Sequence, residues 1–140
     1  MLEKMETWLQ TFPMWEEGCS LQIDHTGAEP GSNGLFPLGM EEMERREDVL
    51  GNVKAYCRCR FKLFRVVTAQ AGNPENAQWL LSLQQWVQQQ SALGLAPQFG
   101  DDAKKEHIRA EKGKLEDASQ AGTATYTAII TCEFEKHYEF

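Results

Sequence analysis

The chain has 140 residues, of which 41% are hydrophobic and 25% are charged, a composition typical of one globular domain with its own core. Its formal net charge of −7 argues against binding to nucleic acid, sequence-specific binding included, and against binding to an anionic membrane surface. Proteins that bind such polyanions usually carry an excess of Lys and Arg. No stretch approaches the roughly 18 apolar residues of a spanning helix, and the charged start is no signal peptide, so we expect a soluble protein made in the cytoplasm with reduced thiols.

The first expected element is a helix over Met1–Phe12, ended by Pro13. Its apolar residues recur at spacings of three and four, which predicts one face lying on a sheet: Leu2, Met5, Leu9 and Phe12. A short strand is expected over Ser20–His25, where Leu21 and Ile23 alternate with polar residues.

The next segment, Gly27–Gly39, contains four glycines and two prolines, which predicts a loop. Leu35, Phe36 and Leu38 are unusual in such a loop. They either fold back onto the core or reach a neighbouring molecule, so they are candidates for a partner-binding loop.

The segment Met40–Asp48 fits two structures. The spacing of Met40, Met43 and Glu47 suits a helix, and a charged edge strand is also possible. The strand is favoured, with a turn over Asp48–Asn52, because the strong strand that follows needs a partner.

That following strand, Val53–Thr68, has strictly alternating side chains. One face carries Val53, Ala55, Cys57, Cys59, Phe61 and Leu63, and the other carries Lys54, Tyr56, Arg58, Arg60 and Lys62. The strand is longer than a typical one, so we expect it to bend or to project beyond its sheet.

A second helix is expected to start at Asn73-Pro74 and to end at Gly94, since Asn favours the N-cap, Pro the first turn and Gly the C-terminal cap. Its apolar stripe includes Trp79, Leu83 and Trp86, whereas its far face is rich in Gln and uncharged. A turn over Gln98–Asp102, a strand over His107–Leu115 and a loop over Glu116–Gly122 are expected next.

The final strand alternates clearly, with Tyr126, Ala128, Ile130, Cys132 and Phe134 on one face. The order of elements predicts an α+β fold: a single domain over residues 1–140, with a small mixed or antiparallel β-sheet of about five strands and two helices packed on it.

Enzymatic chemistry has little support in the sequence. His25, His107 and His137 lie far apart and outside any recognisable motif, and no C-x-x-C pair suggests a zinc site. No phosphate-binding loop or hydrolase elbow is present. We therefore expect no catalytic, cofactor-binding or metal-binding residues, and no cofactor.

Charge is distributed unevenly along the chain. Seven of the 14 basic residues fall between Arg45 and Arg65, and with two acidic residues this stretch carries +5, so the rest of the chain carries −12. One interpretation is a solvated outer face of the sheet. The other is a contact between unlike surfaces of neighbouring subunits, which builds rings or filaments. The candidate interface or lumen residues are Tyr56, Arg58, Arg60 and Lys62.

Several segments occur in an order that resembles a known family. They are Gly34-Leu35-Phe36-Pro37-Leu38-Gly39, Arg46-Glu47-Asp48-Val49-Leu50-Gly51-Asn52, the long strand to Phe64-Arg65, Asn76-Ala77, Trp86-Val87 with Gln90 and Gly94-Leu95-Ala96-Pro97, Gly122-Thr123-Ala124 with Tyr126, and Tyr138. Over about 110 residues this order and spacing resemble the tail-terminator proteins (minor capsid or tail-completion proteins) of long-tailed bacteriophages, especially those of Firmicute prophages.

The resemblance implies a small sheet backed by two helices and a ring, usually of six subunits, that binds the last ring of major tail-tube protein. Such a ring stops tube growth and presents a docking face to the head–tail connector. The protein would be made in the host bacterial cytoplasm and end in the virion tail. A head-completion or connector-stopper protein of the same virion, and a small-molecule-modifying enzyme, are the alternatives.

Overall fold

The computed structural model describes residues 1–15, 20–23, 32–68, 74–118 and 122–139. The helices are α1 (Leu2–Leu9) and α2 (Glu75–Ala92), with a short 3-10 helix η1 (Ala103–Lys105). The strands are β1 (Ser20–Ile23), β2 (Ser32–Glu47), β3 (Val53–Thr68), β4 (His107–Ala118) and β5 (Thr123–Tyr138).

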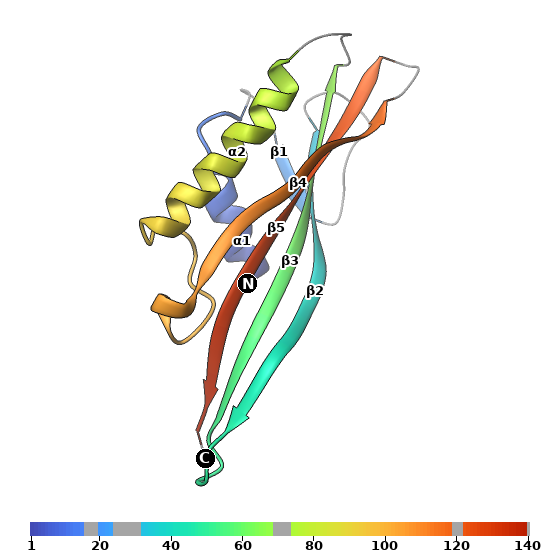
Figure 1. Ribbon diagram of the computed structural model, residues 1–140. Helices are drawn as coiled ribbons and strands as arrows, with labels where there is room; N and C mark the ends of the chain where they lie inside the picture. The colour runs from blue at the N-terminus through green and yellow to red at the C-terminus, as the bar shows by residue number, and fades with distance from the viewer. Residues whose placement is uncertain (16–19, 24–31, 69–73, 119–121, 140) are drawn as a thin grey trace.

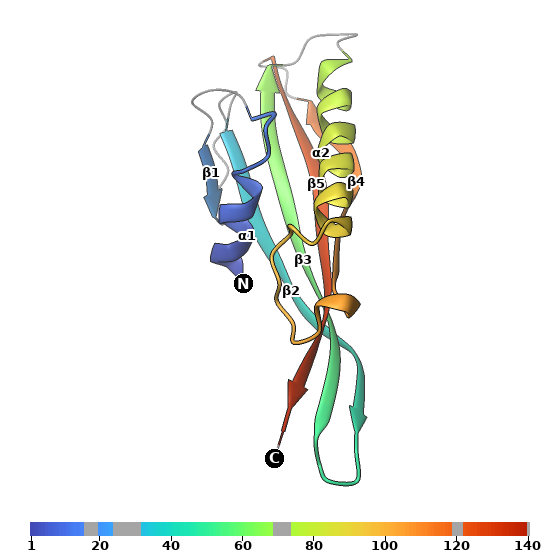
Figure 2. The same cartoon turned by 90° about the vertical axis from the view of Figure 1, so that its left-hand side faces the viewer.

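The five strands form one mixed sheet in the order β1-β2-β3-β5-β4 (Figure 1). β1 runs parallel to β2, and the remaining neighbours are antiparallel. Both helices lie on the same face of this sheet, as the two perpendicular views show (Figures 1 and 2). The predicted α+β class, with about five strands and two helices, is confirmed.

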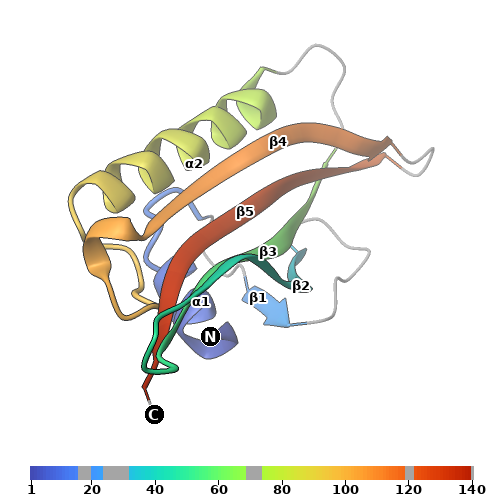
Figure 3. The ribbon, with the colours of Figure 1, turned by 60° about the horizontal axis from the view of Figure 1, so that its bottom comes forward.

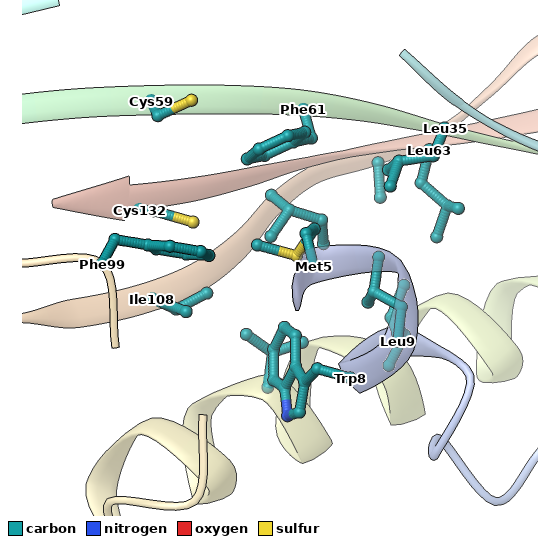
Figure 4. Packing of buried hydrophobic residues seen from close by; sticks show 14 of the residues in the cluster. Met5, Trp8, Leu9, Leu35, Cys59, Phe61, Leu63, Phe99, Ile108 and Cys132 are labelled. Atoms are coloured by element: carbon teal, nitrogen blue, oxygen red, sulfur yellow. The ribbon is translucent and has the colours of Figure 1, made fainter. Parts of the chain in front are cut away.

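The core lies between the two helices and the covered face of the sheet. The alternation predicted for β3 is confirmed, because Ala55, Cys57, Cys59, Phe61 and Leu63 are all buried. Figure 4 shows residues of this core, including Met5, Trp8 and Leu9 of α1. The two helices also contact each other, since the rings of Trp8 and Trp86 stack with centroids 4.9 Å apart.

Gly94 ends α2 as predicted. Its φ of +71° is a left-handed conformation that glycine adopts without a steric penalty. The N–H groups of Gly94 and Leu95 donate to the carbonyls of Ser91 and Gln90, the pair of bonds that defines a Schellman cap.

Met40–Asp48 is a strand rather than a helix, since β2 extends through Glu47 and its register with β3 continues to Glu47 opposite Val53. The prediction of a loop over Gly27–Gly39 is wrong from Ser32 onward, because these residues pair with β1 and β3. Gly34 lies between β1 and β3, whereas Pro37 and Gly39 lie beyond the end of β1, where β2 forms the edge of the sheet and a register shift follows Pro37. The earlier half of that segment lies outside the described residues.

Two other boundaries also differ from the sequence-based prediction. β4 continues to Ala118, so the loop predicted over Glu116–Gly122 is wrong in its first three residues: Glu116 lies at a register shift within the strand, and Asp117 and Ala118 pair with β5. α1 ends at Leu9, and Phe12 reaches the core from the turn that follows, stacking edge-on against Trp79.

Candidate functional site

The face of the sheet opposite the helices carries a cluster of charged side chains centred on Glu133 of β5. This carboxylate is only 7% exposed. Tyr56 Oη donates to it at 2.9 Å, Arg58 Nε at 3.0 Å and Arg109 Nη1 at 3.2 Å, while His107 Nε2 lies 2.8 Å away. The strand order explains the cluster, because β5 lies between β3 and β4 and its Glu133 is in register with both Arg58 and His107.

The surroundings of Glu133 favour its charged form. Burial alone would raise the pKa of this carboxyl, but the hydrogen bonds from Tyr56, Arg58 and Arg109 outweigh burial and lower the pKa to about 2. Burial and the hydrogen bond to Glu133 raise the pKa of Tyr56. The phenol therefore stays protonated and the carboxylate ionised across the neutral range, which suits a permanent structural cluster better than a proton-transfer pair.

The structure pairs the predicted basic residues of β3 within the chain itself. Arg58 Nη2 lies 3.0 Å from Glu133, Arg60 Nη1 lies 3.1 Å from Glu41 of β2, and Lys62 Nζ lies 2.7 Å from Glu116 of β4. The positive charges of Arg58, Arg60 and Lys62 are therefore matched by carboxylates of β5, β2 and β4. Any acidic partner would have to compete with these intramolecular pairs.

The three residues of the predicted partner-binding loop lie in different environments. Leu35 is fully buried in the core, and Phe36 packs edge-on against Phe64 at 5.1 Å on the uncovered face. Leu38 is 53% exposed at the register shift between Pro37 and Met40. Only Leu38 is thus free to contact another molecule through most of its side chain.

The outer part of the β2–β3 hairpin extends past both helices (Figures 1 and 2), and β5 accompanies β3 as far as the Val53–Tyr138 pair, so only the turn lies beyond the sheet. Every residue from Pro37 to Leu50 is exposed. At its tip Val49 is fully exposed and Leu50 is 78% exposed. Two apolar side chains thus occupy the most distant point of the hairpin, where nothing in the described chain contacts them closely enough to shield them.

The tip has a defined turn rather than an arbitrary loop. Asp48 Oδ1 accepts hydrogen bonds from the backbone N–H groups of Leu50 (2.8 Å) and Asn52 (3.0 Å), and Asp48 Oδ2 accepts one from Asn52 Nδ2 (3.0 Å). Gly51 completes the turn at a φ of +87°. The hydrogen bond from the Asn52 backbone is the main reason why the pKa of Asp48 is lowered.

The edges of the sheet differ in how their backbone groups are satisfied. Along β4, Ser91 Oγ accepts from the Ile108 N–H at 3.1 Å and Gln84 Nε2 donates to the Ala110 carbonyl at 3.3 Å. Near the end of β5, Asp101 bonds the Glu135 carbonyl and the His137 N–H, both at 2.8 Å. The outer edge of Met40–Glu47 has no such cap from the described residues, although its charges and its two register shifts protect an edge from unwanted pairing.

A groove of about 490 Å³ runs between α2 and β4, which lie alongside each other (Figure 3). Its walls include Leu81, Gln84, Gln85 and Gln88 of α2 and Ile108 and Ala110 of β4. Among the described residues, Arg109 is the one charged residue that lines it. α2 itself carries a single charged residue, Glu75, among its 18 residues. This surface is therefore much poorer in charge than the rest of the protein.

A second hollow, of about 320 Å³, lies beside the outer part of the hairpin and is lined by charged or polar residues: Glu44, Arg46, Lys54, Tyr56, Lys105 and Glu135. Its carboxylates are already engaged. Arg46 Nε contacts Glu44 at 2.9 Å, and Glu135 is contacted by Lys105 Nζ at 3.4 Å and His137 Nε2 at 2.6 Å. The contacts from His137 and Lys105, led by the one from His137, lower the pKa of Glu135, so this carboxylate is not poised as a general base.

Sequence reasoning missed Glu133, His107 and Arg109 as members of a site. Arg58 and Glu133 are separated by 75 positions, and only the register of β3 with β5 brings them together. Within the described ranges, no group of three or more His, Cys, Asp and Glu side chains is arranged to hold a metal ion. No helix in the same part of the chain has both the length and the apolar character needed to cross a membrane.

Comparison with known proteins adds no assignment. Models of protein families give no match to this chain, and curated proteins give none either.

Proposed function

We propose that this protein is a structural assembly subunit that caps the tail tube of a long-tailed bacteriophage or prophage. In this proposal a ring of copies, expected to number six, binds the last ring of tail-tube protein and ends its polymerisation. The ring then offers a docking face to the head–tail connector. The protein acts by shape and contact and catalyses no reaction.

The observation that carries the proposal is the projecting β2–β3 hairpin. Its β2 residues from Pro37 onward are exposed, and its tip presents Val49 and Leu50 in a turn fixed by Asp48. Two adjacent apolar side chains on a preformed turn make a contact point at low entropic cost, which suits a protein that assembles with a neighbour. The segment order that resembles tail terminators supplies the particular assembly.

The uncovered face of the sheet also supports a role in assembly, but as a surface of paired charges rather than as the basic surface that the sequence suggests. Its basic residues are balanced by Glu133, Glu41 and Glu116, so it presents a rigid network of alternating charge. Such a face contributes specificity and orientation in a ring, because a misplaced subunit would set like charges against each other.

The test is binding to preassembled tubes of the cognate tail-tube protein, with the cognate head–tail connector as the comparison. Gold-labelled protein is expected at tube ends and absent from tube walls in electron micrographs. Binding to the connector alone, with bare tube ends at saturating protein, would favour the head-completion alternative and contradict the terminator role.

A further inference from the structure

The outer edge of β2 is open over Met40–Glu47. β1 pairs only with Ser32–Leu35, so within the described ranges no strand borders the later part of β2 on that side. We infer that two copies of this chain pair antiparallel along this edge, around a two-fold axis between Met43 and Glu44. The inference goes beyond the proposed function, because it concerns free chains away from a tail tube.

An open edge of this kind calls for a strand as its partner. Its backbone N–H and C=O groups repeat at the spacing of a strand, and only another extended backbone can bond them in series. The outer part of the hairpin extends past both helices, which leaves this edge accessible (Figures 1 and 2). Charged side chains and register shifts deter an arbitrary strand, so a suitable partner has to match the charges of β2.

The register shift at Met43 decides which charges share a face. Glu41 lies opposite Arg58, whose side chain is on the uncovered face. Arg46 lies opposite Lys54, which alternates onto that same face. Glu41 and Arg46 are an odd number of positions apart, so they would point to opposite faces in a regular strand. The extra residue, Met43, therefore brings the two side chains to one face.

The same shift aligns a second pair on the other face. Glu42 lies opposite Cys57, and Arg45 lies opposite Ala55. Cys57 and Ala55 are buried on the face that carries the helices. Both faces of the edge thus have the same order, with a glutamate before the shift and an arginine after it.

This order is self-complementary when two copies run antiparallel. In the inferred register Glu41 of one copy faces Arg46 of the other, and Glu42 faces Arg45. The two-fold axis repeats both contacts, so opposite charges meet on each side of it. Each contact joins side chains that lie on one face, as antiparallel pairing requires.

Neighbouring registers are disfavoured by the faces or by the charges. A slide of one residue would set side chains of opposite faces against each other. A slide of two residues keeps the faces matched, but in one direction it sets Glu41 against Glu44. In the other direction it sets Glu42 against Glu47. Like charges directly opposite each other destabilise a sheet, so the charges specify one register.

The contacts that these residues make within one chain do not block the pairing. Arg45 Nε lies 2.9 Å from Glu42, and Arg46 Nε lies 2.9 Å from Glu44. All four side chains are exposed, as is that of Glu41. A guanidinium carries several N–H donors and a carboxylate several acceptor sites, so each can bind a second partner across the interface. The two copies then build a network of alternating charges and strand none of them.

The apolar residues near the two ends of the edge fit the same register, which places Leu38 of one copy beside Val49 of the other. Leu38 is half exposed and Val49 is fully exposed in the single chain. β1 ends opposite Leu35, so Leu38 is open to the approaching tip. An antiparallel pair thus brings together apolar side chains from opposite ends of the hairpin edge and removes them from water.

The experiment reverses the charges on one half of the edge at a time. The acidic variant is Arg45→Glu with Arg46→Glu, and the basic variant is Glu41→Arg with Glu42→Arg. In either variant alone, the side chains that face each other across the axis have like charges. Circular dichroism and thermal unfolding establish that each variant is folded.

The control variant is Lys104→Glu with Lys114→Glu. Both lysines are exposed and lie on η1 and β4, away from the β2 edge. The control changes the net charge by the same amount as the acidic variant, so it separates a local contact from a general effect of charge.

Molar mass is measured by sedimentation equilibrium over a wide concentration range. The parent chain and the control are expected to form a dimer, which its two-fold symmetry closes. Each charge-reversed variant alone is expected to dimerise about tenfold more weakly or worse, because its facing side chains repel. An equimolar mixture of the acidic and basic variants is expected to form a mixed dimer, since every reversed residue then meets its opposite.

Amide hydrogen exchange gives an independent readout of the backbone pairing. In the parent chain, exchange within Met40–Glu47 is expected to be slower at high concentration than at low concentration. Exchange along β4 is expected to be the same at both concentrations, because that edge takes no part in the pairing.

Four outcomes would overturn the inference: a parent chain that forms no dimer at any concentration, charge-reversed variants that dimerise like the parent, folded variants that form no mixed dimer, or exchange within Met40–Glu47 that is the same in monomer and dimer. None of these would remove the proposed function, because binding to tube ends is measured separately on the parent chain. Conversely, a mixed dimer without binding to tube ends would keep the edge pairing and reject the terminator role.

Discussion

Arg58 of β3 and Glu133 of β5 sit directly opposite each other in the sheet, with Arg58 Nη2 3.0 Å from the Glu133 carboxylate. Together with Tyr56 and Arg109 they form a polar cluster outside the core, in which the Glu133 carboxylate is almost enclosed. The cluster ties β3, β5 and β4 together on the face that no helix covers.

Removal of the Glu133 charge should therefore destabilise the fold. Glu133→Gln keeps the size of the side chain but leaves Arg58 and Arg109 without their carboxylate, and we expect the free energy of unfolding to fall by about 2 to 3 kcal/mol. Urea unfolding measures the change. Glu41→Gln is the control, since Glu41 is mostly exposed and its loss should cost less than about 0.5 kcal/mol. Equal stability of the two variants would contradict a structural role for the cluster.

The low pKa of Glu133 also makes stability depend on pH. A carboxyl whose pKa falls from 4.5 in the unfolded chain to about 2 in the folded protein stabilises the fold at neutral pH by on the order of 3 kcal/mol. That contribution is complete above pH 4.5 and is lost as the pH falls towards 2. Urea unfolding between pH 7 and pH 2.5 should show a steeper loss for the parent than for Glu133→Gln, and parallel curves would refute this origin.

The electrostatic contact suggested for β3 is best tested by changing Arg60 alone. Arg58→Glu would set a second carboxylate against Glu133 and should destabilise the monomer. Arg60→Glu should leave the fold intact to within about 0.5 kcal/mol, because its partner Glu41 is solvated. Arg60→Glu is thus the variant that separates assembly from folding. Weaker association without loss of thermal stability would support a charged subunit contact, whereas unchanged association would remove Arg60 from it.

Asp48 should control the order of the hairpin tip without affecting the core. Asp48→Ala removes the acceptors for the Leu50 and Asn52 N–H groups, so amide hydrogen exchange at these two positions should become faster. Thermal unfolding should change little, because the hairpin projects from the domain. Glu47→Ala is the matched control and should leave exchange at both amides unchanged. Slow exchange in Asp48→Ala would mean that the turn does not depend on this carboxylate.

The sequence predicts elements well where one physical signal dominates. The alternation in β3 separates a buried face from a charged face, and Gly94 marks the end of α2 through its backbone freedom. Prediction fails at Ser32–Gly39, because β1 pairs with the first four residues, and because Pro37 and Gly39 are accommodated where β2 becomes the edge of the sheet and its register shifts.

The candidate surfaces were harder to predict from the sequence. The pairing of Arg58 with Glu133, and of Lys62 with Glu116, depends on strand register, which no local pattern specifies. The exposure of Val49 and Leu50 likewise depends on how far the hairpin extends beyond its neighbours. Only the uncharged far face of α2 could be read directly from the glutamines in the sequence.

The most direct test of the terminator role is the length of tail tubes grown from the cognate tail-tube protein with increasing amounts of this protein. Electron micrographs should show tubes that shorten in proportion to the amount added, each capped at one end. Tubes of unchanged length with uncapped ends, at a molar excess of the protein, would contradict the proposed function.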